Sequence, residues 1–161
     1  MSITESPSRA SAALVREVRD CRALPGDVDH GIEDRFGPRM AMISGHLFRS
    51  ATSIRDDDMG VVASALADAL YLVYVTPAEL GIHLPWAGPS PSPRVRLAFS
   101  ECLATLSSAT SSWAISGADA ADVARTFLPH VELALRDMAR ALDLDVDEAL
   151  RADVESRRRD L

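Results

Sequence analysis

Residues 65–85 read ALADALYLVYVTPAELGIHLP, and this stretch decides the fold. Apolar side chains occupy almost every position, which is typical of a helix that has packing partners on every side. One carboxylate, Asp68, stands near the start of the run with no opposite charge beside it. We therefore expect a central helix over about residues 58–82, lying at the centre of a dimer or of an intramolecular pseudo-dimer.

Helical periodicity predicts five further helices, and no stretch shows convincing strand alternation. They cover about residues 9–23, 38–54, 93–114 and 116–142, with a short last helix from 145. The acidic residues 56–58 suit the start of the central helix, and DVDE at 145–148 resembles a capping box. Ser92 is expected to cap the helix at 93, and Pro77 and Pro129 are expected to kink their helices. The sequence predicts one all-α domain over residues 1–161, built as a bundle.

The composition excludes some classes of function. The net charge of −7 argues against general nucleic-acid binding, which needs a basic surface. The basic run at 157–159 is interpreted as a solvated helix end rather than a phosphate clamp. Asp68 would be costly inside a lipid bilayer, so no membrane span is expected. The two cysteines, Cys21 and Cys102, have no CxxC spacing, and the N-terminus lacks a signal-peptide pattern, so we predict a cytoplasmic protein.

Three segments are informative in their order: VREVRDCRALPGD, RMAMISGHLFRSA and ALADALYLVYVTPAELGI, all within residues 14–84. They resemble the first three helices of the all-α NTP pyrophosphohydrolases, the MazG-like proteins that include relatives of phosphoribosyl-ATP pyrophosphohydrolase. The resemblance implies a MazG-like helical bundle whose first half covers residues 9–84. In that family an ExxE pair on one helix and an ExxD pair on the next bind Mg²⁺, which prefers hard oxygen ligands.

This chain departs from the family pattern at three of the four metal-binding positions. His46 and Arg49 stand where the glutamates of ExxE are expected, and Ala65 replaces the glutamate of ExxD, so only Asp68 remains. We predict that Arg49, with His46 nearby, neutralises Asp68, because a guanidinium can pair with a carboxylate without a metal. The alternative is that Asp68 forms only local hydrogen bonds inside the core. No metal and no cofactor are expected.

Residues 85–93, PWAGPSPSP, form the one clear linker, and a family-like pattern partly restarts after it. SATS recurs at 50–53 and 108–111, and an alignment of Leu128 with Leu66 places His130 opposite Asp68. Residues 94–161 are therefore either a degenerate second repeat or a continuation of the bundle.

The loss of carboxylates favours a repurposed site for a small organic molecule. We predict a pocket between the second, third and fifth helices, with Asp68 and His46 as the catalytic residues if a reaction occurs. The expected ligand-binding residues are Arg49, Tyr71, Tyr74, Trp113 and His130. Core packing is the alternative role for each aromatic side chain, including Trp86 as a wall of the pocket.

Two other functions stay open. One is a non-catalytic scaffold or binding protein that forms a homodimer through the central helix. The other is a divergent nucleotide pyrophosphohydrolase, which ranks last because one carboxylate cannot hold Mg²⁺ and a triphosphate and because Arg49 would repel the metal. The expected partners are a small molecule and a second copy of the chain, with no nucleic acid and no membrane.

Overall fold

The computed structural model describes residues 13–18, 31–86, 88 and 90–160. Every regular element in these residues is a helix, so the predicted all-α fold is confirmed. The helices are a short helical segment at 13–18, α2 (Ile32–Arg55), α3 (Met59–Glu79), α4 (Val95–Ala114), α5 (Ala120–Ala141) and α6 (Val146–Arg159).

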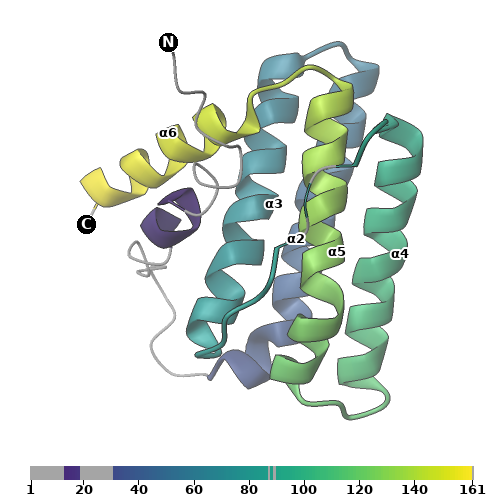
Figure 1. Cartoon of the computed structure of the whole chain (residues 1–161), viewed down its shortest axis with the longest axis vertical. Helices are drawn as coiled ribbons and strands as arrows, with labels where there is room; N and C mark the ends of the chain where they lie inside the picture. Colours follow the sequence, from purple (N-terminus) through teal and green to yellow (C-terminus); the bar gives the residue numbers. More distant parts are fainter. Residues whose placement is uncertain (1–12, 19–30, 87, 89, 161) are drawn as a thin grey trace.

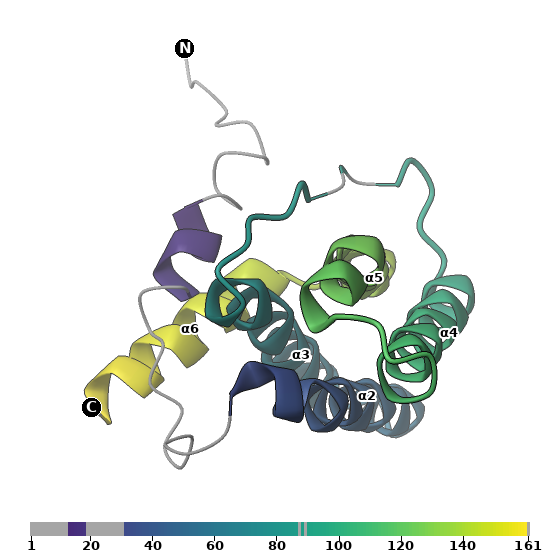
Figure 2. The same ribbon diagram turned by 90° about the horizontal axis from the view of Figure 1, so that it is seen from below.

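Four of these helices, α2 to α5, form a bundle (Figures 1 and 2). α2 packs on α3 and α4 packs on α5, while α3 also contacts α5 and α2 contacts α4. α2 and α5 run in one direction, and α3 and α4 run in the other (Figure 1). A long crossover through residues 80–94 returns the chain to the opposite end of the bundle, a connection that four-helix bundles use. The bundle thus contains two helix pairs, α2 with α3 and α4 with α5, and the tandem repeat stays a prediction.

α3 lies at the centre of the packing. It contacts α2, α5 and α6, and every residue from Ala65 to Ala78 except Asp68 is buried. The helix is long and apolar enough to cross a membrane, but 67% of its most apolar window is buried in the bundle, as in the core helix of a soluble protein. Contacts within the chain therefore cover α3 without a second copy.

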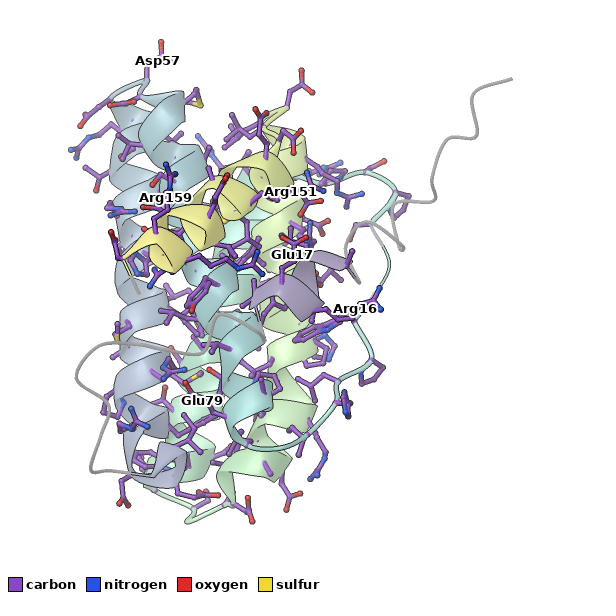
Figure 3. The ribbon with its side chains drawn as sticks, turned by 90° about the vertical axis from the view of Figure 1, so that its left-hand side faces the viewer. Arg16, Glu17, Asp57, Glu79, Arg151 and Arg159 are labelled. Carbon is purple, nitrogen blue, oxygen red and sulfur yellow. The ribbon has the colours of Figure 1, made fainter. Side chains whose placement is uncertain are left out.

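α6 crosses the outside of α3 at the end of the chain (Figure 3). The helical segment at 13–18, which carries Arg16 and Glu17, lies beside α6. Leu14 and Val18 of this segment are buried and join the core. The remainder of the first predicted helix, including Cys21, lies outside the described residues.

Acidic side chains cap two helices as predicted. The Asp58 carboxylate accepts a hydrogen bond from the Val61 amide at 3.2 Å. The Asp145 carboxylate accepts one from the Glu148 amide at 3.0 Å. Both contacts satisfy amide groups that have no partner inside the first helical turn.

The predicted starts of two other helices are wrong. α4 begins at Val95 after Arg94, and no side chain caps it, so Ser92 does not serve as the cap. α2 begins at Ile32, before the predicted start at 38, and accommodates Pro38 inside the helix. Two acidic residues in its first turn favour this earlier start because they interact with the positive end of the helix dipole.

The predicted linker at 85–93 is bound to α5. Ser90 Oγ donates a hydrogen bond to Asp137 Oδ2 at 2.5 Å, and Arg140 pairs with the other oxygen of this carboxylate. Arg140 also donates to the Ser90 carbonyl at 3.1 Å. Asp137 is only 6% exposed, so these contacts satisfy a buried charge as well as fixing the crossover.

Candidate functional site

Arg49 and Asp68 form an ion pair between α2 and α3. Arg49 Nη2 donates to Asp68 Oδ2 at 2.7 Å, so the predicted pairing is confirmed. The Asp68 side chain is 20% exposed and that of Arg49 is 45% exposed, which places the pair at the surface of the bundle rather than in the dry core. A pair exposed to this extent contributes about 0–1 kcal/mol to stability.

His46 lies one helical turn before Arg49 on the same side of α2. Its Nδ1 is 3.9 Å from Asp68 Oδ2, which is beyond hydrogen-bond length. Partial burial lowers the pKa of His46, and the positive charges of Arg49 and Arg157 lower it further against the opposing effect of Asp68 and Asp153. The imidazole is therefore neutral at pH 7 and can accept a hydrogen bond or take up a proton.

α6 adds residues to this cluster that the sequence did not connect with it. The Arg157 guanidinium lies over the Tyr71 ring, 4.1 Å from its centroid, in a cation–π contact. Arg157 also pairs with Asp153 at 3.0 Å. The interpretation of residues 157–159 as a solvated end is wrong for Arg157, whereas the next two arginines are exposed. Sequence spacing held no signal for this contact, because only the crossing of α6 over α3 brings the two residues together.

Tyr74 belongs to a second, buried network. Its hydroxyl donates to Glu132 Oε1 at 2.7 Å and accepts hydrogen bonds from Arg136 at 2.8 and 3.0 Å. Arg136 donates to Glu132 Oε1 at 2.6 Å and to Asp147 Oδ1 at 2.9 Å. The network joins α3, α5 and the first turn of α6, so the Tyr74 hydroxyl is engaged in a structural role.

Glu132 is the buried acid of this network, and the sequence analysis did not identify it. The residue is 2% exposed, and its Oε2 has no hydrogen-bond partner among the described residues. Burial raises the pKa of Glu132, although the contacts with Tyr74 and Arg136 act in the opposite direction. The sequence did carry a signal for this ion pair, because Glu132 and Arg136 are four residues apart on one helix. However, pairs at this spacing usually lie in solvent.

Trp113 and His130 lie in other parts of the bundle. Trp113 packs against Phe36, with 6.3 Å between ring centroids, and against Gly37. Gly37 precedes His46 by nine residues, which is about 13 Å along a helix. His130 is exposed on α5, which barely contacts α2. The residues that the structure gathers into one cluster are His46, Arg49, Asp68 and Tyr71, whereas Tyr74, Trp113 and His130 lie elsewhere.

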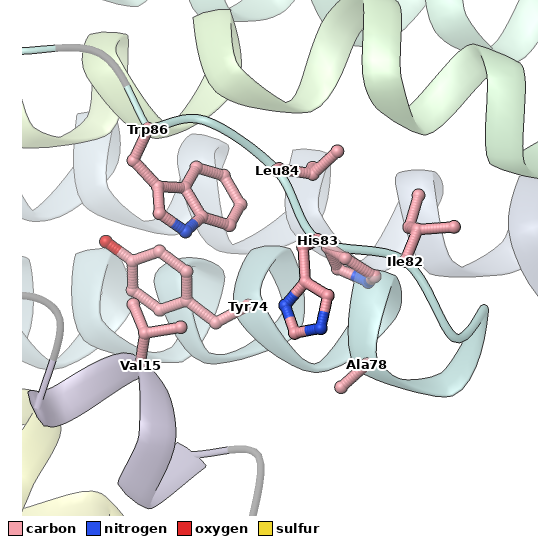
Figure 4. Close-up of a pocket in the computed structure, with 8 residues that line it drawn as sticks. Val15, Tyr74, Ala78, Ile82, His83, Leu84 and Trp86 are labelled. Atoms are coloured by element: carbon pink, nitrogen blue, oxygen red, sulfur yellow. The ribbon is translucent and has the colours of Figure 1, made fainter.

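A small cavity lies between Tyr74 and the crossover (Figure 4). Val15, His83 and Trp86 line it together with Tyr74, and the Trp86 ring meets the Tyr74 ring edge-on at 5.0 Å. Its volume of about 40 Å³ is far below the roughly 300–1,000 Å³ of sites for organic ligands. The larger pocket was predicted between the second, third and fifth helices, and buried apolar side chains of α2, α3 and α5 belong to one core cluster there.

The residues around Asp68 do not fit a magnesium site. Mg²⁺ requires near-octahedral oxygen ligands, whereas the nearest charged partner of Asp68 is a guanidinium. The described part of the chain also holds no group of three or more His, Cys, Asp or Glu side chains that could bind a metal. No catalytic step through Mg²⁺ follows from this arrangement.

Comparisons of the chain with protein-family models, with curated proteins and with solved structures find no match. The resemblance to the MazG-like proteins therefore rests on the three motifs within residues 14–84 and stays a prediction.

Proposed function

We propose that this chain is a metal-independent binding protein for a small organic molecule, built on a MazG-like bundle that has lost its magnesium site. The observation that carries the proposal is the 2.7 Å hydrogen bond from Arg49 to Asp68. It puts a permanent positive charge where the related family has a metal-binding glutamate, and this charge opposes the binding of a divalent cation. We also propose a cytoplasmic location for the protein, on the cysteine spacing and the N-terminal pattern described above.

The chemistry of the cluster supports a ligand with an anionic group. Arg49 uses Nη2 on Asp68 and keeps 45% of its side chain exposed, so further N–H donors can reach a carboxylate or a phosphate. His46 adds a neutral imidazole that can accept a hydrogen bond from a ligand hydroxyl. If the ligand reacts, His46 is placed to act as a general base, and Asp68 orients Arg49 beside it.

Ligand titration without divalent cations tests the proposal. Calorimetry and NMR with a panel of small carboxylates and phosphate esters should identify a ligand that shifts the resonances of His46 and Arg49. Arg49→Gln should then weaken binding at least about tenfold, because a hydrogen bond to a charged group contributes about 1.5–3 kcal/mol. Asp68→Asn and His46→Ala should also weaken it.

Arg125→Gln is the matched control for Arg49→Gln. Arg125 pairs with Asp122 at 3.0 Å on the exposed side of α5, so this variant removes the same kind of ion pair outside the cluster. Equal losses of affinity in the two variants would contradict the proposed site. Release of pyrophosphate from a nucleoside triphosphate in the presence of Mg²⁺ would contradict the metal-independent function.

The filled interior favours a second candidate, a non-catalytic scaffold protein. The cavity at Tyr74 has a volume of only about 40 Å³, and the His46 and Asp68 side chains lie in a partly exposed cluster. A scaffold needs an exposed interaction surface instead of a pocket. Retention of a protein partner by a chain that carries Arg49→Gln and His46→Ala would favour this candidate over the first.

A further inference from the structure

Two contacts hold the Arg157 guanidinium beside the cluster around Asp68. Its carbon lies 4.1 Å from the centre of the Tyr71 ring, and its Nε donates to Asp153 Oδ2 at 3.0 Å. Its two Nη atoms make no hydrogen bond to any residue that the structure describes. Because the side chain is 32% exposed, these N–H donors can reach a ligand.

Arg49 on α2 is held in a similar way. Its Nη2 donates to Asp68 Oδ2 at 2.7 Å, and 45% of its side chain is exposed. Each of the two arginines therefore has one N–H group fixed by a carboxylate and further N–H groups left for a ligand. A guanidinium that is already oriented loses less conformational freedom when it binds an anion.

His46 lies close to both arginines. The charges of Arg49 and Arg157 both lower its pKa, so two cations from different helices act on one imidazole. This is possible because α6 crosses α3 and its C-terminal end lies toward the side of α2 (Figures 2 and 3). Asp68 and Asp153 balance the two cations, so the site is close to neutral while the imidazole is uncharged.

The N–H donors of this site suit a phosphate group better than a carboxylate. A carboxylate is planar, and one guanidinium fork satisfies it with two parallel hydrogen bonds. Two guanidinium groups on different helices suit a group with three terminal oxygens, which a phosphate monoester supplies. An anion between the arginines also favours the imidazolium form of His46, which adds another donor to the site.

We propose that Arg157 is a second ligand-binding residue of this site and that the ligand is a small phosphate monoester held between Arg49 and Arg157. This ligand class rests on the proposed function, because the same cluster binds it. The last turn of α6 then completes a site that α2 and α3 begin. Asp68 and Asp153 are positioning residues, since each orients one of the two arginines.

Calorimetry of the full chain without divalent cations tests the proposal with phenyl phosphate and benzoate as probes. Phenyl phosphate should bind about tenfold more tightly than benzoate, because it engages both arginines. Arg157→Gln should remove this preference and leave benzoate binding nearly unchanged, since Arg49 alone satisfies a carboxylate. Arg158→Gln, at the neighbouring exposed position, removes the same charge and is the control. Circular dichroism checks that the helices of each variant are intact.

NMR of His46 in the wild-type chain provides an independent measurement. Sulfate, a tetrahedral anion that keeps its charge near neutral pH, should raise the pKa of His46, because it places negative charge beside the imidazole. Sodium chloride at equal ionic strength is the control for screening of the arginines. The rise caused by sulfate should be smaller in Arg157→Gln.

The possible results separate this ligand class from the proposed function. Phenyl phosphate that binds no more tightly than benzoate, or equal effects of Arg157→Gln and Arg158→Gln, would overturn the phosphate site. Benzoate binding that depends on Arg49 would still support the proposed function in that case. Equal losses of affinity in Arg49→Gln and Arg125→Gln would instead overturn the proposed function itself.

Discussion

The guanidinium carbon of Arg157 lies 4.1 Å from the centre of the Tyr71 ring. This contact joins the last turn of α6 to the middle of α3, one helical turn after Asp68. The contact also places a second positive charge near His46. Burial is the largest cause that lowers the pKa of His46, and the charges of Arg49 and Arg157 lower this pKa further. His46 therefore reports on the assembly of the whole cluster.

Two single changes should shift the pKa of His46 in opposite directions. Arg157→Gln should raise the pKa, because it removes a positive charge that disfavours the imidazolium. Asp68→Asn should lower the pKa, because it removes the carboxylate that favours the imidazolium. Titration of the His46 ring protons by NMR measures both effects. Arg158→Gln next in the chain is the control, and shifts of the same sign in the first two variants would refute the geometry of the cluster.

Two glycines of α2 should respond oppositely to alanine. Gly37→Ala should destabilise the fold by about 1–3 kcal/mol, as overpacking of a filled core does. The new Cβ would lie 2.4 Å from Cζ3 of Trp113, so the indole must move. Gly45→Ala should stabilise the monomer by roughly 0.5–1 kcal/mol, because its Cβ meets open space and alanine favours the helix. Urea unfolding at low protein concentration measures both changes, and a stabilised Gly37→Ala variant would contradict the packing of Trp113.

The wild-type protein should lose stability as the pH rises through the raised pKa of Glu132, and Glu132→Gln should remove this loss. Burial raises the pKa of Glu132, so the folded protein binds this proton more tightly than the unfolded chain does. The resulting stability is fully present below the unfolded pKa and is lost as the pH rises through the raised folded pKa. His46 acts with the opposite sign because its folded pKa is lowered, and its effect cancels in the difference between wild type and variant.

Urea unfolding at a series of pH values above about 4.3, the ordinary pKa of glutamate, measures this difference. The free energy of unfolding of the wild type, relative to that of Glu132→Gln, should fall as the pH increases. Parallel pH profiles for the two proteins would show that Glu132 is not a buried acid with a raised pKa.

Cys102 should resist thiol reagents in the folded protein. Its side chain is buried in α4, and burial raises the pKa of the thiol to about 12. Because only the thiolate reacts, labelling at pH 8 in a Cys21→Ser background should require unfolding and should accelerate with urea. Cys102→Ala supplies the unlabelled baseline. Rapid labelling of the native chain would contradict the burial of Cys102.

The pairing of Arg49 with Asp68 could be predicted because the two helices that carry it are consecutive. Only the short turn at residues 56–58 separates α2 from α3, so the helices must run antiparallel and place these positions at similar heights. Asp58 and Asp145 could be predicted as caps for a similar reason, since a cap depends on residues a few positions away. The exposure of the Arg49 and Asp68 pair could not be predicted, because the pairing of two consecutive helices does not say which side of them other helices cover.

The sequence by itself determined the class of the fold and the place of α3 in it, because an apolar helix without a polar face must be covered on all sides. The sequence also determined that α2 and α3 are neighbours, because only a short turn separates them. Only the tertiary structure decided that Arg157 lies on Tyr71 and that Glu132 points into the core. Both depend on how helices separated by a long crossover and a sharp turn pack together. Helical periodicity indicates which face of a helix is buried, but not which helix covers it.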